Sequence, residues 1–180
     1  MKHVFMTLLI GFTLPFSGCA QKKQANATTT KQTDDVKVVA LSDKLNSQQV
    51  LETIIKTYKG KVAVIDYWAT WCGPCRAAMK QIDPIKESYL KNKKDVAFVY
   101  ITGETSPLPT WKEAIKTIKG FHYRLSDNQF NNLLKSLGIM GIPTYMIVGK
   151  DGKITYDNIQ TGGYPGDDVI KEEIDKALGK

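Results

Sequence analysis

The sequence predicts an α/β fold in which a central mixed sheet is flanked by helices, with an N-terminal signal and a tether in front of it. Three observations support this prediction. Short apolar runs typical of buried strands alternate with segments of helical periodicity. Glycine and other turn residues separate these segments. The chain then ends in a hairpin pattern and one more helix, which indicates strands that are parallel early and antiparallel late.

The predicted domain opens with a helix and a buried strand. Ser47–Tyr58 carries apolar residues at helical spacing, and Gly60 follows as a stop signal. Val62–Trp68 is a nearly continuous apolar run, which is typical of a strand that is buried on both faces.

A second helix and a second buried strand follow. The helix is expected to begin near Cys72 and to continue through Tyr89. Pro84 lies inside it and removes one backbone hydrogen-bond donor, which is a common cause of a kink. Val96–Ile101 is the next apolar run and is predicted to be a buried strand.

The third part of the domain contains shorter elements. Pro109–Ile118 is predicted to be a helix and His122–Leu125 a short edge strand. Asn128–Leu137 is predicted to be another helix, which Gly138 ends.

The last part of the domain contains the hairpin. Ile142–Val148 and Ile154–Tyr156 are predicted strands, and the Asp151-Gly152 pair between them marks a hairpin turn. Asp167–Leu178 closes the chain as an amphipathic helix.

Length and charge limit what the chain can be. Its 180 residues suit one catalytic domain with an appendage, and its composition of 42% hydrophobic and 24% charged residues is ordinary for a globular protein. The formal net charge of +7 comes from lysines spread along the whole chain. Because no basic stripe is interleaved with stacking aromatic residues, we expect no nucleic-acid partner.

The amino terminus is predicted to be an export signal. Lys2 precedes an apolar run from Val4 to Phe16, which is too short to span a membrane as a helix, and the small residues Ser17 and Gly18 follow. This layout is typical of a secretory signal peptide that is removed.

The residues around Cys19 resemble a lipoprotein signal. The stretch from Phe16 to Cys19 resembles the lipobox of bacterial lipoproteins, in which cleavage precedes a cysteine that becomes lipid-modified; Phe16 departs from the usual leucine. The alternative is simple secretion with Cys19 as a spare thiol. Residues 20–33 are polar and read as a flexible tether. We therefore expect a signal peptide at 1–18, a lipidated tether at 19–40 and a domain at 41–180.

The closely spaced cysteines point to redox chemistry. Three cysteines are too few for a disulfide scaffold, so Cys72 and Cys75 are read first as a reactive pair. At a strand-to-helix junction, free N–H groups and the helix dipole stabilise a Cys72 thiolate, while Cys75 falls one turn inward. We expect Cys72 to be the nucleophile and Cys75 the resolving thiol. Pro74 fits the first helical turn.

The segment from Asp66 to Cys75 resembles the active site of the thioredoxin family, and the stretch from Gly141 to Thr144 resembles the loop of that family that carries a cis-proline. The resemblance covers about Asn46–Leu178 and implies a thioredoxin-like fold. The export segment, the tether and extra residues between Thr102 and Arg124 look more like the membrane-anchored TlpA/ResA branch.

The resemblance also implies roles for residues. Asp66 would move a proton to and from Cys75, and the alternative is a structural charge at a strand. The expected substrate-binding residues are Trp71, Gly73, Pro74, Ile142 and Pro143.

Two departures from the family pattern concern the proton path and the second helix. No lysine lies in Val96–Ile101, where thioredoxin keeps one to pair with the buried aspartate, so Asp66 is expected to titrate differently. Pro84 stands in for a helix-kinking proline expected at Lys80, which displaces or abolishes the bend.

Two other classes of function are weighed against redox catalysis. A structural zinc site needs four ligands, whereas the mature domain offers only Cys72, Cys75 and His122 as nitrogen or sulfur donors, so we expect neither a metal nor another cofactor. A binding module without turnover would use Trp68, Trp71 and Trp111 as a docking surface. Trp68 is more typical of the core, and Trp71 is expected to flank the substrate groove.

The direction of electron flow is predicted from the two residues between the cysteines. Gly-Pro resembles reducing thioredoxin, at about −270 mV, rather than the oxidant DsbA at about −120 mV. We therefore expect a reductant of disulfides in exported proteins, with cytochrome c precursors as one client class and a membrane thiol-electron transporter as the donor. The alternative is an oxidant or isomerase of the same fold. The expected location is the bacterial cell envelope, with a lipid anchor on a membrane facing the periplasm or the exterior.

Overall fold

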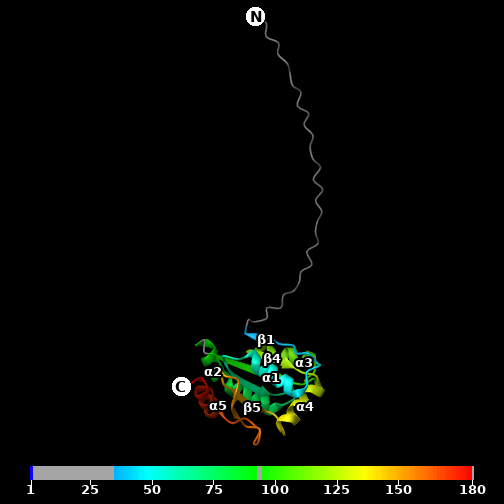
Figure 1. The fold of residues 1–180 in the computed structure, drawn as a ribbon, viewed down its shortest axis with the longest axis vertical. Coiled ribbons are helices and arrows are strands. Elements are labelled where there is room, and N and C mark those ends of the chain that lie inside the picture. Colours follow the sequence, from blue (N-terminus) through cyan, green and yellow to red (C-terminus); the bar gives the residue numbers. More distant parts are fainter. Residues whose placement is uncertain (2–34, 93–94, 180) are drawn as a thin grey trace. The chain divides into compact units, whose positions relative to one another are not determined.

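A six-stranded sheet with helices on both faces forms the domain of this computed structural model, which describes residue 1, residues 35–92 and residues 95–179 (Figure 1). The strands lie in the order β1-β4-β3-β2-β5-β6. The predicted α/β class with a mixed central sheet is confirmed.

The helices and strands predicted from the sequence are all present, with ends that differ by a few residues. The strands are β1 (Val36–Val38), β2 (Val62–Tyr67), β3 (Val96–Thr102), β4 (Gly120–Arg124), β5 (Thr144–Val148) and β6 (Ile154–Asp157). The helices are α1 (Ser47–Thr57), α2 (Gly73–Lys91), α3 (Leu108–Ala114), the 3-10 helix η1 (Ile115–Thr117), α4 (Asp127–Leu137) and α5 (Asp167–Leu178).

The direction of the strands reverses twice across the sheet, once at β5 and again at β6. β1, β4, β3 and β2 pair in parallel, whereas β5 runs antiparallel to β2 and β6 runs antiparallel to β5. The sheet is therefore parallel early and antiparallel late, as predicted. The hairpin between β5 and β6 closes where the Gly149 N–H donates to the Lys153 carbonyl at 2.8 Å.

The prediction of an edge strand near His122 is wrong. β4 lies between β3 and β1, because β1 pairs with it from Val36 opposite Gly120 to Val38 opposite His122. A strand of three residues shows no readable period, so the sequence did not predict β1, which lies within the segment 19–40 expected to be the tether. Gly120 has a φ of +136°, and a Cβ there would lie 2.6 Å from the Phe98 carbonyl oxygen. A glycine is required where these strands approach.

Local capping groups set the ends of the helices. Asn46 and Gln49 form a capping box at the start of α1, and Ser126 caps α4. Gly138 ends α4 in the left-handed conformation. The helix predicted over Pro109–Ile118 is in fact shorter, because α3 ends at Ala114 and η1 continues it as a tighter turn.

Each face of the sheet packs against its own helices, and we call the two sides the α2 face and the α1 face. On the α2 face, Val64, Trp68 and Phe98 belong to one apolar cluster with buried residues of α2, α3 and α5. On the α1 face, Ile65 and Val99 belong to a second cluster with buried residues of α1 and α4. Alternation along each strand therefore divides the core into two layers. No helix within the described residues is long and apolar enough to cross a membrane.

Candidate active site

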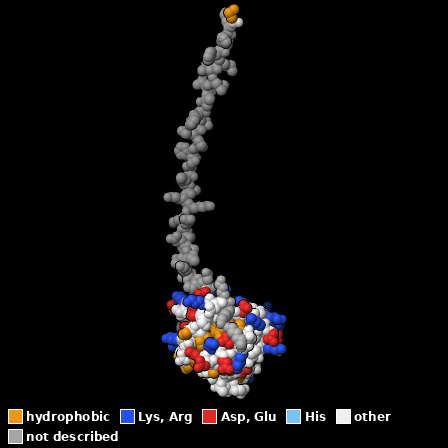
Figure 2. Space-filling model, turned by 90° about the vertical axis from the view of Figure 1, so that its left-hand side faces the viewer, with side chains coloured by type: hydrophobic (Ala, Val, Ile, Leu, Met, Phe, Trp, Pro, Cys, Tyr) orange, Lys and Arg blue, Asp and Glu red, His pale blue; other side chains and the backbone are white. Residues whose placement is uncertain are grey.

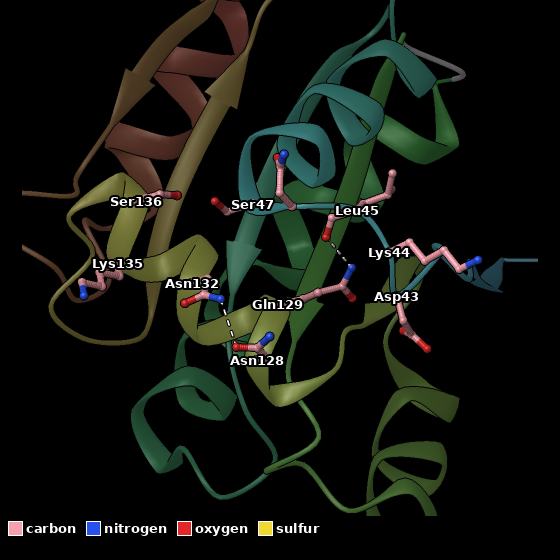
Figure 3. A pocket seen from close by; sticks show the side chains of 10 residues that line it. Asp43, Lys44, Leu45, Ser47, Asn128, Gln129, Asn132, Lys135 and Ser136 are labelled. Carbon is pink, nitrogen blue, oxygen red and sulfur yellow. Dashed lines mark hydrogen bonds between the residues drawn. The ribbon is translucent and has the colours of Figure 1, made fainter.

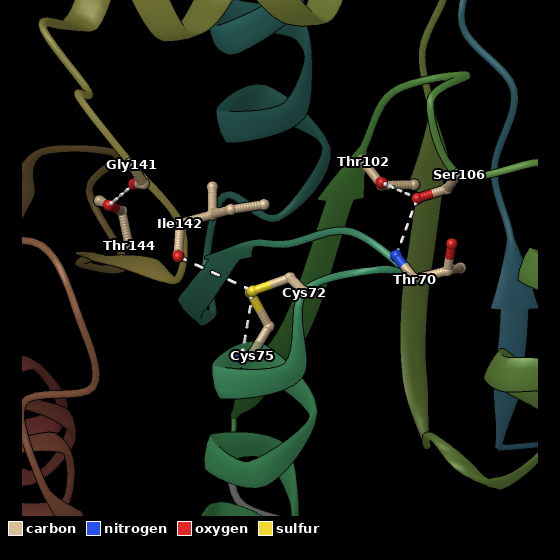
Figure 4. The surroundings of a disulfide bond; sticks show 8 residues. All are labelled: Thr70, Cys72, Cys75, Thr102, Ser106, Gly141, Ile142 and Thr144. Carbon is tan, nitrogen blue, oxygen red and sulfur yellow. Dashed lines mark hydrogen bonds between the residues drawn. A yellow bond between two sulfur atoms is a disulfide. The ribbon is translucent and has the colours of Figure 1, made fainter.

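The two closely spaced cysteines form a disulfide at the start of α2 (Figure 4). Cys72 is the N-cap residue, and the Cys75 N–H points at its sulfur at 3.1 Å. Pro74 occupies the first turn, where its missing N–H leaves no helix bond unmade. Only 4% of Cys72 is exposed, and Cys75 is fully buried. An approaching group therefore meets the sulfur of Cys72 first, but the exposure of that sulfur is slight.

The N-terminal position has a direct electrostatic consequence. Backbone N–H groups of the first helical turn have no partner within the helix, and the helix dipole adds positive potential there. The Cys75 N–H of this first turn points at the sulfur of Cys72. Both effects favour the thiolate of Cys72 over its thiol, and the thiolate is the reactive species.

The turn that carries Cys72 is held by Ser106, which follows β3. The Ser106 hydroxyl accepts a hydrogen bond from the Thr70 N–H at 3.0 Å and shares another with the Thr102 hydroxyl at 2.8 Å (Figure 4). Ser106 is fully buried, and its carbonyl accepts from the Arg124 Nε at 2.9 Å. Sequence reasoning missed these residues, because a serine in a loop carries no periodic signal.

The loop between α4 and β5 faces the disulfide from the other side. The Ile142–Pro143 peptide is cis, and the Ile142 carbonyl oxygen lies 3.7 Å from the sulfur of Cys72 (Figure 4). The Thr144 hydroxyl donates to the Gly141 carbonyl at 2.7 Å, and the Gly163 N–H donates to the Pro143 carbonyl at 2.9 Å. Two separate segments therefore hold this loop beside the disulfide.

Two exposed apolar side chains lie on the segments next to the disulfide. Trp71, next to Cys72, is 63% exposed, and Met140, two residues before Ile142, is 95% exposed. Gly73 and Pro74 are exposed at the start of α2, whereas Ile142 is half-buried and Pro143 is buried. The predicted substrate-binding residues thus lie on the two segments that flank the sulfur of Cys72.

Asp66 lies on β2 and is buried, with 3% of its surface exposed. Neither carboxylate oxygen has a hydrogen-bond partner among the described residues. Burial raises the pKa of Asp66 to about 8, although Tyr145 and the charge of Lys86 act in the opposite direction. A carboxyl group with a pKa near neutrality can both accept and release a proton at physiological pH.

A buried lysine acts on Asp66 from the second helix. β3 contains no lysine, as the sequence indicated, yet Lys86 of α2 is only 1% exposed and its charge lowers the pKa of Asp66. Sequence reasoning missed this residue. Its position within a stretch of buried helix residues, Ile82, Lys86 and Tyr89, is the signal that was available.

The positions of the tryptophans bear on the alternative of a docking surface, and the position of His122 bears on the alternative of a metal site. Of the three tryptophans, Trp68 and Trp111 are buried and only Trp71 is exposed, so the three do not form a shared docking surface. His122 is fully buried, its Nε2 lies 2.7 Å from the Ile118 carbonyl oxygen, and its ring stacks on Tyr100.

A polar hollow lies away from the disulfide, between the start of α1 and α4 (Figure 3). The Gln129 amide inside it donates to the carbonyls of Ser42 and Leu45, both at 3.0 Å, and the Asn132 amide donates to Asn128. These bonds tie the segment before α1 to α4. The hollow contains none of the predicted site residues, and the Gln129 and Asn132 amides that line it donate within the protein.

The surface charge is mixed on the side of the domain that Figure 2 shows. Basic and acidic side chains are interspersed there, without a continuous basic patch on that face. This distribution gives no platform for a nucleic-acid backbone on that face.

Comparisons with known proteins agree with the geometry. The family described as thioredoxin-like matches residues 60–154, which include both cysteines and Pro143. The thiol-disulfide oxidoreductase ResA of Bacillus thuringiensis subsp. konkukian is 24% identical over 100 residues, which are 56% of this chain and 56% of that protein. The match therefore spans little more than half of that relative.

Two further relatives extend the comparison. The thioredoxin-like protein YneN of Bacillus subtilis is 27% identical over 185 residues, covering 99% of this chain and 95% of that protein. The crystal structure of the thioredoxin domain of a thiol-disulfide oxidoreductase from Bacteroides vulgatus aligns with a TM-score of 0.54 at 21% identity, over 66% of this chain and 83% of that one. This last likeness supports the fold alone. The predicted signal peptide, Cys19 and most of the predicted tether lie outside the described residues.

Proposed function

Because the chain belongs to the thioredoxin-like family, we propose that it is a thiol-disulfide oxidoreductase that reduces disulfides in exported proteins through Cys72 and Cys75. The observation that carries the proposal is the disulfide at the first turn of α2, beside the Ile142 carbonyl. Relatives named as thiol-disulfide oxidoreductases support the same reaction class.

The first chemical step is an attack on the client disulfide. The Cys72 thiolate forms a bond to one client sulfur, the client disulfide bond breaks, and the other client sulfur leaves as a thiolate that takes a proton from water. The first turn of α2 favours the attacking thiolate. The result is a mixed disulfide between Cys72 and the client.

The second step releases the client. Cys75 transfers its proton to the Asp66 carboxylate, and its thiolate attacks the sulfur of Cys72. The mixed disulfide breaks, and the second client sulfur leaves and is protonated. Two electrons have passed from the cysteine pair to the client, and the pair is left as the disulfide described above. The full burial of Cys75 restricts its attack to the neighbouring sulfur.

The exposed surface next to Cys72 suits an extended client segment. Trp71 offers an apolar surface on one side, and the loop at Ile142 and Pro143 offers backbone groups on the other. Gly73 and Pro74 leave the approach to the sulfur open because they lack long side chains.

The proposed direction is reduction. Gly-Pro between the cysteines resembles reducing thioredoxins, and a ResA-like role supports the same direction. An exported reductant needs a donor, which we propose to be a membrane thiol-electron transporter. The proposed clients are exported protein disulfides, with cytochrome c precursors as one class.

The proposed location is the bacterial cell envelope, facing the periplasm or the exterior. It rests on the sequence of residues 1–40, read as a signal peptide at 1–18 and a tether at 19–40 with lipid on Cys19, ahead of a domain at 41–180. The full chain is expected in the membrane fraction of a bacterial host, and Cys19→Ala is expected to move it to the soluble fraction. An unchanged distribution would argue against the lipid anchor.

The decisive experiment for the direction is the reduction potential of the Cys72–Cys75 pair. We expect the protein, carrying Cys19→Ser so that only the pair reacts, to equilibrate with dithiothreitol or glutathione buffers below about −230 mV. A potential above about −180 mV would instead assign an oxidant or isomerase. Cys75→Ser provides the control, because it leaves no intramolecular disulfide to titrate.

A further inference from the structure

Four titratable side chains form a buried row across the α2 face of the sheet. Strand register places Asp66 opposite Tyr145 on β5 and opposite Tyr100 on β3, and Tyr100 in turn opposite His122 on β4. All four are at most 3% exposed. Because cross-strand neighbours lie about 5 Å apart, the four side chains adjoin one another in one layer on the α2 face of the sheet.

Lys86 enters this layer from α2. Its Nζ lies 3.3 Å from the Tyr100 hydroxyl and 2.6 Å from a carboxylate oxygen of Asp83, one turn earlier on the same helix. It also lies 5.6 Å from the centre of the Tyr100 ring. Lys86 is 1% exposed, whereas Asp83 is 48% exposed.

The burial of the Lys86 ammonium group costs free energy, so a compensating charge is expected nearby. A lysine on a helix usually extends its ammonium group into water, and removing an ammonium group from water is unfavourable unless an opposite charge compensates it. Asp83 compensates only in part, because half of its side chain faces solvent. When Asp66, the acidic residue of the row, gives up its proton, a second negative charge appears in the same layer.

We propose that Lys86 is a positioning residue for the redox reaction, whose buried positive charge, held by Asp83, stabilises the ionised carboxylate of Asp66. This inference rests on the proposed function, in which the Asp66 carboxylate accepts the proton of Cys75. Lys86 touches neither the client nor the reacting sulfurs, so its effect passes through Asp66. The lysine that β3 lacks is replaced, in this chain, by one on the helix that carries both cysteines.

The other groups around Asp66 are neutral near physiological pH. Burial raises the pKa of Tyr100 and Tyr145 far above 10 and lowers the pKa of His122 to about 4. Tyr164, before α5, also has a raised pKa. The buried residues of α5 on this side, Ile170 and Ile174, are apolar. Among the described groups that shift the pKa of Asp66, Lys86 is the cation.

The test is the titration of Asp66 in the full chain, followed by carboxyl carbon NMR in the oxidised state, where neither Cys72 nor Cys75 titrates. Every variant carries Cys19→Ser. We expect Lys86→Met to move the Asp66 midpoint upward by at least about one pH unit, as loss of a nearby opposite charge does. Lys80→Met removes an exposed lysine of the same helix and is expected to leave the midpoint unchanged.

Activity supplies the second readout. We expect the pH profile for insulin reduction by Lys86→Met to move to higher pH in the same direction as the Asp66 midpoint. Lys86→Gln is neutral but keeps N–H donors for Tyr100 and Asp83, so it gives the same two measurements if the methionine variant does not fold. An Asp66 midpoint and a pH profile that both match the unsubstituted chain would overturn the inference.

The two proposals can fail separately. If the unsubstituted chain does not reduce insulin, the proposed function fails, and the Asp66 titration still decides whether Lys86 acts on the carboxylate. If the unsubstituted chain reduces insulin but Lys86→Gln leaves the Asp66 midpoint in place, only the role of Lys86 is lost.

Discussion

The two faces of the sheet are built from the same strands but bury different chemistry. On the α1 face, β2 and β3 contribute Ile65 and Val99 to an apolar layer. On the α2 face, the adjacent residues of the same strands are Asp66 and Tyr100. The side-chain period of two allows one strand to stabilise the fold on one side and to carry titratable groups on the other. The titratable side chains whose burial costs free energy are therefore concentrated on the face that packs against α2, the helix that begins at the two cysteines.

Unpaired polar atoms follow the same division. Within the described residues, those without a hydrogen-bond partner on the α2 face include both oxygens of Asp66, the Nδ1 of His122 and the Tyr145 hydroxyl. On the α1 face the Tyr67 hydroxyl belongs to this group. Each buried unpaired group costs free energy, so these polar atoms reduce the stabilisation that burial on the α2 face provides.

The largest expected effect is on the stability of the α2 face as pH changes. The pKa of Asp66 is about 8 in the folded protein against an ordinary value of 3.8, so folding favours the protonated form. The stabilising contribution is fully present below about pH 4 and is lost as pH rises to about 8. Asp66→Asn removes this titration. We expect it to exceed the unsubstituted chain in unfolding free energy by on the order of 5 kcal/mol above pH 8.

The measurement is denaturant unfolding of the oxidised protein between pH 4 and pH 8.5. Ile65→Val is the matched control, one residue earlier on β2 and facing the other layer. It should cost about 1 kcal/mol at every pH, because it removes one buried methylene group and no charge. Parallel curves for Asp66→Asn and the unsubstituted chain would remove the distinction between the faces.

The same contrast explains what the sequence could predict. Cys72 and Cys75 are close in the chain and their spacing carries its own chemistry, so the redox pair and the start of α2 followed from local pattern. The buried strands were equally readable, because β2 and β3 are continuous apolar runs. These features depend on neighbours within a few residues.

The features that were missed depend on residues that are distant in sequence. Lys86 reads as an ordinary helix lysine until the sheet shows that its side chain points at Tyr100. Ser106 reads as a loop residue until its bond to the Thr70 N–H is known. β1 is too short for periodicity, and its pairing with β4 is what makes β4 an internal strand. Each of these three features depends on a contact between residues that are far apart in the sequence, so a short stretch of sequence could not predict it.

The smallest expected effect concerns the tyrosine hydroxyls of the α1 face. It compares Tyr58, which has a hydrogen-bond partner, with Tyr67, which has none within the described residues. The hydroxyls of Tyr58 and Tyr123 lie 2.9 Å apart, whereas the Tyr67 hydroxyl has no partner within the described part of the chain. Tyr58 and Tyr67 are both buried in the apolar cluster of the α1 face. Tyr58→Phe should therefore lower the unfolding free energy by about 1 kcal/mol, because it breaks a buried hydrogen bond. Tyr67→Phe should change it by less than about 0.5 kcal/mol or raise it, since it removes an unpaired polar atom. Denaturant unfolding at pH 7 measures both. Equal losses would mean that the Tyr67 hydroxyl also has a hydrogen-bond partner, so that the α1 face holds no unpaired tyrosine hydroxyl among its described residues.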